Sequence, residues 1–102
     1  MTHPAIAYKI LTGAQWAQFQ DNAVFTGAPV DLADGYIHLS TQDQLQGTLD
    51  KHFCGQSGLV IAEIDLRLLG STVRWEVSRG GALFPHVYGP LPKAAVRNWR
   101  PA

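Results

Sequence analysis

The sequence predicts a single α+β domain. Its 102 residues suffice for one hydrophobic core, and no repeat, low-complexity stretch or linker divides residues 1–102. The expected order of elements is β-α-β-α-β-β-β, with a loop in the first half and a small element at the C-terminus. Because the strands gather toward the C-terminal half instead of alternating with helices, this order favours an α+β fold over a doubly wound parallel sheet.

The first strand and the first helix follow from residues 5–15. Residues 5–11, AIAYKIL, predict a strand. The helix begins after Thr12, because Thr12 and Gln15 have the spacing of a capping box, in which each side chain satisfies a free backbone N–H. Residues 26–35, TGAPVDLADG, combine proline, aspartate and glycine and predict a loop.

A second strand runs directly into the second helix. Residues 35–40, GYIHLS, alternate as a strand. Either Ser40 with Asp43 or Thr41 with Gln44 can cap the helix that follows, and apolar side chains then recur at helical spacing.

The C-terminal half predicts three further strands. Residues 59–66, LVIAEIDL, are β-branched and mostly apolar, which is typical of a central strand. Residues 72–77 alternate apolar and charged side chains, and residues 83–89, LFPHVYG, form the next strand. Pro85 has no N–H to donate, so it predicts an edge or a bulge there. A helical turn starting near Pro92 and a short terminal strand complete the chain.

Composition excludes some classes of partner. Eight basic residues balance eight acidic ones without a basic run, which disfavours binding to duplex nucleic acid. No stretch approaches the roughly 18 apolar residues of a membrane span, and the N-terminus lacks the pattern of a signal peptide. Cys54 is the single cysteine, so no internal disulfide forms. A cytoplasmic monomer is the default expectation.

The strand GYIHLS presents an unusual polar face. Its alternation places Tyr36, His38 and Ser40 on one side and Ile37 and Leu39 on the other. The imidazole of His38 can hold a ribose hydroxyl or a phosphate, or move a proton. A hydrogen-bonded structural histidine on a half-buried sheet is an equally good interpretation. Ser40 can contact a ligand or cap the helix.

A second segment repeats the pattern of a histidine flanked by aromatic residues. Phe84, His86 and Tyr88 share one face of the strand LFPHVYG. Aromatic rings beside an imidazole can stack a planar ligand and orient its polar edge. Aromatic residues also pair across strands for stability alone. The two segments are therefore either two walls of one pocket or two half-buried edges.

Glu76 is the third candidate residue. Its carboxylate can act as a base or bind two ribose hydroxyls. It can equally be a solvated strand residue paired with Arg74 or Arg79. The histidines and the cysteine do not show the spacing of a metal site, so no metal is expected.

These motifs, taken together, resemble a family of small bacterial proteins. The segments that carry the resemblance are YKIL with the tryptophan that follows, DGYIHLST, LVIAEIDL, Glu76 and FPHVYGPL, spread over nearly the whole chain. They look like the family called domain of unknown function 952. That resemblance implies an ADP-ribosyltransferase-like fold, a small split, curved and mostly antiparallel sheet that binds NAD in its central cleft. It implies that His38 and Ser40 lie in that cleft, with Glu76 as the acidic residue.

The resemblance includes one departure. Lys9 stands on the first strand, where members of the fold carry a histidine that holds the nicotinamide ribose. An ammonium group can still engage a phosphate. Two functions follow as expectations: a transferase that uses NAD or ADP-ribose, with His38 and Glu76 catalytic, or a non-catalytic module that binds a nucleotide or another metabolite. A third interpretation is that both cleft histidines, His38 and His86, are structural.

Overall fold

The protein, described by a computed structural model over residues 3–102 without the side chain of Arg79, is built around a three-stranded antiparallel sheet. Its strands are β1 (Ile6–Leu11), β4 (Val60–Asp65) and β8 (Val96–Pro101), in the order β1-β4-β8. The apolar segment that predicted a central strand is β4, as expected. The predicted first strand is confirmed as β1.

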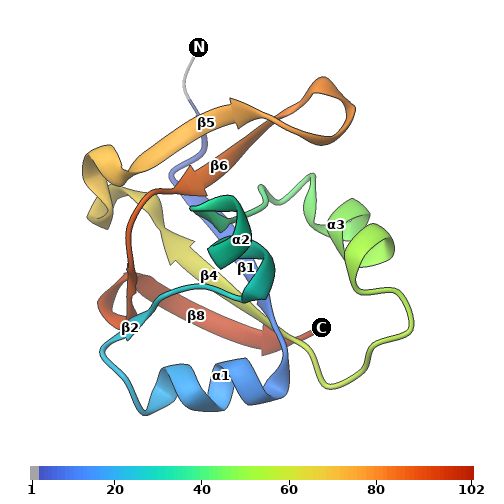
Figure 1. The fold of residues 1–102 in the computed structure, drawn as a ribbon, viewed down its shortest axis with the longest axis vertical. Coiled ribbons are helices and arrows are strands. Elements are labelled where there is room, and N and C mark those ends of the chain that lie inside the picture. Colours follow the sequence, from blue (N-terminus) through green and yellow to red (C-terminus); the bar gives the residue numbers. More distant parts are fainter. Residues whose placement is uncertain (1–2) are drawn as a thin grey trace.

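A second three-stranded sheet lies beside the first. It contains β3 (Ile37–His38), β6 (Leu83–Val87) and β5 (Val73–Val77) in the order β3-β6-β5, and all its pairs are antiparallel. The two sheets are joined where Tyr8 and Ser40 exchange backbone hydrogen bonds of 2.7 and 2.9 Å. Figure 1 shows the β5–β6 hairpin projecting at one end of the molecule and the β1-β4-β8 sheet below it.

Short elements complete the architecture. A two-stranded antiparallel pair joins β2 (Val24–Phe25) to β7 (Leu91–Pro92). The α-helices are α1 (Gly13–Gln20), α2 (Pro29–Asp34) and α3 (Leu45–His52). Single 3₁₀ turns span Leu66–Leu68, Gly70–Thr72, Arg79–Gly81 and Lys93–Ala95. The predicted α+β class with mostly antiparallel strands is confirmed.

Helices cover both faces of the β1-β4-β8 sheet. On one face Leu11 packs in a core with Phe19 of α1. On the other face Ile10 packs with Leu45 of α3. This alternation follows the period of two along β1, and it places Lys9 on the same face as Leu11.

The capping box predicted at the first helix is present. The Thr12 N–H donates to Gln15 Oε1 over 2.9 Å, and the Gln15 N–H donates to Thr12 Oγ1 over 3.1 Å. The structure also decides between the two caps predicted for the helix after residues 35–40, which is α3. Thr41 and Gln44 make the same reciprocal pair in the turn before α3, at 3.0 and 3.3 Å, so the alternative with Ser40 is wrong.

The loop predicted over residues 26–35 is wrong, because it contains α2. Pro29 occupies the first turn of α2, and Gly35 ends it in the left-handed conformation with φ 87°. Both features are signals for the ends of a helix. The sequence predicts a loop instead, because the six residues of α2 show no apolar periodicity and its buried residue is the carboxylate Asp31.

The edge predicted at Pro85 is also wrong, because β6 is the central strand of its sheet. The Pro85 carbonyl accepts a hydrogen bond from the Leu39 N–H over 3.1 Å, on the side of β3. In an extended strand the N–H and C=O of one residue point to the same side. The missing N–H of Pro85 therefore faces Leu39, one residue beyond His38, the last residue of β3. Pro85 removes one of the two bonds of that pair, at the end of the β3 ladder and not within it.

Candidate functional site

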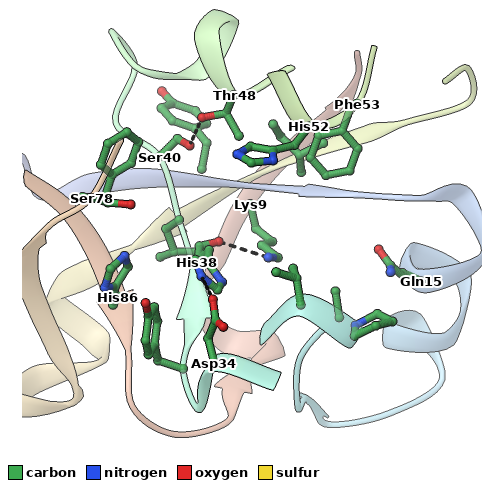
Figure 2. Close-up of a pocket in the computed structure, with 18 of the residues that line it drawn as sticks. Lys9, Gln15, Asp34, His38, Ser40, Thr48, His52, Phe53, Ser78 and His86 are labelled. Carbon is green, nitrogen blue, oxygen red and sulfur yellow. Dashed lines mark hydrogen bonds and ion pairs between the residues drawn. The ribbon is translucent and has the colours of Figure 1, made fainter. Parts of the chain in front are cut away.

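A cleft of about 570 Å³ lies between the two sheets and the helices α2 and α3. That volume is typical of small-ligand sites, which occupy about 300–1,000 Å³. The lining side chains come from β1, α2, β3, α3 and β6, elements far apart in the sequence. Figure 2 shows histidine, hydroxyl and aromatic groups converging on it.

His38 lies on one wall, held between two carboxylates of α2. Its Nδ1 is 2.7 Å from Asp31 Oδ1 and its Nε2 is 2.9 Å from Asp34 Oδ2. A neutral imidazole carries one N–H and can donate to one of these groups, whereas the imidazolium donates to both. Both aspartates belong to the segment in which no helix was expected, so these partners of His38 were missed from the sequence.

Asp31 is the buried centre of this network. Its side chain is 1 % exposed. Besides His38 Nδ1, its oxygens accept the backbone N–H of Ala28 over 2.7 Å and that of His38 over 3.1 Å. Burial alone opposes its ionisation. The hydrogen bond from His38 and the charge of Lys9 outweigh burial and lower the pKa of Asp31 to about 2.

Lys9 lines the cleft, but its ammonium group is engaged inside the protein. Its Nζ lies 3.0 Å from Asp31 Oδ2 and donates to the His38 carbonyl over 3.0 Å. Burial lowers the pKa of Lys9 from 10.5, although Asp31 acts in the opposite direction. The structure thus pairs Lys9 with Asp31, at the position where the resemblance implies a histidine.

His86 lies on the neighbouring strand and is paired with Glu76. The ring is almost completely buried and lines the cleft, and its Nδ1 is 2.8 Å from Glu76 Oε1. The Tyr88 hydroxyl donates to the same Glu76 oxygen over 2.7 Å. Hydrogen bonds from Tyr88 and then from His86 lower the pKa of Glu76 below its usual 4.5. An ionised Glu76 holds the hydrogen of neutral His86 on Nδ1, which leaves the Nε2 lone pair as an acceptor.

An aromatic ring packs against both histidines. Tyr36 stacks on His86 with centroids 4.1 Å apart, and its centroid lies 4.7 Å from that of His38. The two imidazoles, which pair across β3 and β6, have centroids 5.4 Å apart. Arg74 lies over the ring of Tyr88 at 4.6 Å. Tyr36 was placed on the polar face by strand alternation, but its role as the contact between the histidines appears only in three dimensions.

The predicted site residues fall into two groups. Lys9, His38, Ser40, Phe84 and His86 all line the cleft. The hydroxyl of Ser40 contacts Thr48 Oγ1 on α3 over 2.9 Å.

The other two predicted residues lie behind His86. The atoms of Glu76 and Tyr88 do not line the cleft, and both side chains contact His86 or each other. Of the pairings expected for Glu76, the structure shows Arg74 nearby, lowering its pKa, whereas the side chain of Arg79 lies outside the described part. The two segments with a histidine and aromatic residues therefore belong to one pocket, but as adjacent strands of one sheet they form a single wall of it and not two opposed walls.

Two further properties bear on the site. Among the described residues, no group of three or more histidine, cysteine or acidic side chains is arranged to hold a metal ion. In the same part of the chain, every helix is too short or too polar to cross a bilayer.

Comparison with known proteins places the chain in a sequence family. The model of a family described as "Protein of unknown function (DUF952)" matches residues 10–99. No curated protein matches.

Solved structures of one bacterial protein have the same fold. The crystal structure of protein CC0527 from Caulobacter crescentus is 45% identical, with a TM-score of 0.91 over 94% of this chain and 84% of that one. Its solution NMR structure is 44% identical, with a TM-score of 0.83 over 95% of this chain and 84% of that one. These likenesses support the α+β fold, and they add no support for the ADP-ribosyltransferase-like part of the expectation.

Proposed function

The chain belongs to the family of proteins of unknown function DUF952, and we propose that its cleft binds small-molecule substrates and that His86, oriented by Glu76, accepts a proton from one of them. The observation that carries this proposal is the pair formed by His86 and Glu76 at the wall of the cleft. A carboxylate on Nδ1 fixes the tautomer and the orientation of the ring, so that Nε2 can accept a proton, which is the arrangement of a general base.

The surrounding groups fit a ligand with a planar ring and hydroxyl groups. Tyr36 and Phe84 supply aromatic surface in the cleft, and Ser40 supplies a hydroxyl. Such a combination of apolar walls and a few convergent polar groups is typical of small-molecule sites. His38 contributes a second imidazole 5.4 Å from the first, measured between ring centroids.

NAD or an ADP-ribose derivative is the first ligand class to test. The family resemblance supports this choice, and so does the division of the strands into two sheets around the cleft. In such a reaction the C1′–N bond of the ribose breaks and nicotinamide leaves with the bonding electrons. The acceptor, whose proton passes to His86, then bonds to C1′. Glu76 acts through His86, because its carboxylate stands behind that ring.

A binding module without catalysis is the second candidate. It is favoured by the internal contacts of the predicted ligand residues, since Lys9 is paired with Asp31 and His38 with both aspartates of α2. This function predicts saturable binding without consumption of the ligand. In either case we propose a cytoplasmic, monomeric protein, in keeping with the single cysteine and the balanced charge.

A thermal-shift panel tests the proposal. It contains NAD, NADP, ADP-ribose, nicotinamide and cyclic nucleotides. A ligand at about a hundred times its dissociation constant adds about 2.7 kcal/mol to the free energy of unfolding. For a domain of this size the melting temperature then rises by roughly 10 °C or more.

Two variants connect binding to the cleft. His86→Asn keeps an N–H near the position of Nδ1, so it can still donate to Glu76, but it removes Nε2. We expect this variant to lose the shift while it stays folded, and His38→Ala to weaken it. Asp50→Asn, on the exposed side of α3, is the control and keeps the full shift. A panel without any shift would count against a nucleotide site and favour structural histidines.

Turnover separates the two candidates. Release of nicotinamide from NAD is followed by chromatography for the parent protein and for Glu76→Gln. A transferase loses turnover in Glu76→Gln because Nδ1 of His86 no longer faces a full negative charge. Unchanged turnover would remove Glu76 from the mechanism, and binding without any release would establish the binding module.

A further inference from the structure

Helix α2 forms part of one wall of the cleft, and its attachment to the protein is unusual. Its residues Pro29, Val30 and Asp34 line the cleft. Helices in folded proteins are normally held by an apolar stripe, because propensity alone does not stabilise so short a segment. In α2 the buried residue is Asp31, whereas Val30 and Leu32 are 56% and 65% exposed.

Polar contacts therefore hold α2 in place. Asp31 binds Lys9 of β1 and both the ring and the backbone of His38 on β3. Asp34, at the other end of the helix, binds the second ring nitrogen of His38. The Asp31 contacts are buried, and the Asp34 contact is half-exposed with a side-chain exposure of 46%.

Glycines with positive φ flank the helix on both sides. Gly27 has φ 128° and Gly35 has φ 87°. These conformations are accessible to glycine at low cost, and glycines at the ends of an element can absorb the backbone rotation of a hinge. The Gly35 N–H and the Tyr36 N–H both bond the carbonyl of Asp31, over 2.8 and 3.2 Å, and would report separation of the helix end.

We propose that α2 is a gate of the cleft, held closed by the contacts of Asp31 and Asp34 and opening by local unfolding of the segment between Gly27 and Gly35. The gate rests on the proposed function, because it regulates access to the same ligand site. The half-exposed contact between Asp34 and His38 breaks first, since solvent reaches it. The buried contacts of Asp31 set the population of the open state.

Hydrogen exchange measures this opening without any ligand. In the parent protein the amides of Leu32, Gly35 and Tyr36 should exchange faster than those at the centre of β4, with little dependence on added denaturant. That behaviour identifies local opening. If these amides instead match β4 in both exchange free energy and denaturant dependence, α2 opens only with global unfolding and the proposal is overturned.

A variant of the exposed contact tests the mechanism of closure. Asp34→Asn removes a charged hydrogen-bond partner at a site where unfolding is not expected. We expect the α2 amides to exchange about two- to fivefold faster, because a half-exposed ion pair contributes less than about 1 kcal/mol. The β4 amides should change by no more than the same factor, since the contact is also lost on global unfolding. Asp50→Asn on α3 removes a carboxylate that accepts from Gln46 and should change neither segment. Equal exchange in the parent and Asp34→Asn would overturn the role of this contact in the gate.

Access to the cleft is read separately by chemical modification. His86 is 2% exposed, so diethyl pyrocarbonate should reach it only when the cleft opens. Peptide mass spectrometry follows its modification in the parent and in Asp34→Asn, with His3, outside this cleft, as the internal standard. A matching increase at His86 supports the gate. Faster exchange of α2 without faster modification of His86 would show that α2 moves without controlling access, and would overturn it.

Discussion

Replacing Asp31 by asparagine tests the buried network most directly. One carboxylate oxygen of Asp31 accepts from His38, the other accepts from Ala28, and both lie within 3.1 Å of Lys9 Nζ. In Asp31→Asn one of these oxygens becomes an NH₂ group, which cannot accept. On one side of the network a donor then faces another donor instead of an acceptor. The substitution also removes the negative charge that balances Lys9.

The expected loss of stability is large. Removing one member of a buried ion pair costs about 3–5 kcal/mol, because the remaining charge stays buried without compensation. Lys9 is 5% exposed, so it matches this case. Domains of this kind are stable by about 5–15 kcal/mol in total. We expect Asp31→Asn to lower the melting temperature by about 12 °C or more.

Urea unfolding followed by far-UV circular dichroism measures this loss. Asp34→Asn, which removes the other carboxylate from the same imidazole, is the matched control. It should cost less than about 1 kcal/mol, since its ion pair is half-exposed. The double variant Asp31→Asn with Lys9→Met removes the uncompensated charge as well. It should recover at least about 1 kcal/mol relative to the sum of the single changes.

Two results would refute this reasoning. A cost below about 1 kcal/mol for Asp31→Asn would show that the carboxylate does not anchor α2. Additive effects of Asp31→Asn and Lys9→Met would show that the two side chains do not interact across the 3.0 Å contact.

Three further outcomes follow from the same contacts. Because the pKa of Asp31 is lowered from 3.8 to about 2, its ionisation stabilises the folded chain by about 2 kcal/mol above about pH 4. This contribution is lost as the pH falls through about 2. The difference in the free energy of unfolding between the parent and Asp31→Asn should therefore shrink on acidification, and a difference that stays constant with pH would contradict it. Tyr88→Phe removes the main cause of the lowered pKa of Glu76, so a carboxyl NMR titration should show that pKa rising, and an unchanged value would contradict the assignment. Thr12→Ala removes one half of the capping box and should cost about 0.5–2 kcal/mol by urea unfolding, whereas no measurable cost would show that the cap contributes nothing.

The two histidines of the cleft, neighbours on β3 and β6, have different partners. His86 is backed by one carboxylate, which fixes its tautomer. His38 is held between two carboxylates, and both of these come from α2. His38 therefore belongs both to the cleft and to the attachment of its wall. A ligand that binds His38 Nε2 would compete with Asp34, which links occupation of the cleft to the position of α2.

Local sequence patterns predicted the elements that depend on near neighbours. The reciprocal bonds of Thr12 and Gln15 join residues three apart, so their spacing was sufficient to place the start of α1. The apolar run of β4 predicted its central place between two strands, since both its faces are covered. Strand alternation also placed each histidine on a polar face of its strand, and because His38 pairs with His86, both lie on the same face of one sheet.

The sequence did not predict the features that depend on contacts between residues far apart in the chain. Pro85 fits a central strand only because β3 ends at His38, which no local pattern shows. Helix α2 lacks an apolar stripe, and its anchor is a charge whose partners lie 22 residues earlier and 7 residues later in the chain.

The sequence by itself thus determined the α+β class, the main strands and the two histidine faces, because these follow from periodicity and capping between neighbouring residues. Only the tertiary structure decided which charges are paired. It pairs Lys9 with Asp31 and Glu76 with His86, and it brings the two histidine segments together at one cleft. The physical reason is that the partner of a buried charge is set by packing in three dimensions, since an unpaired charge cannot remain in the core.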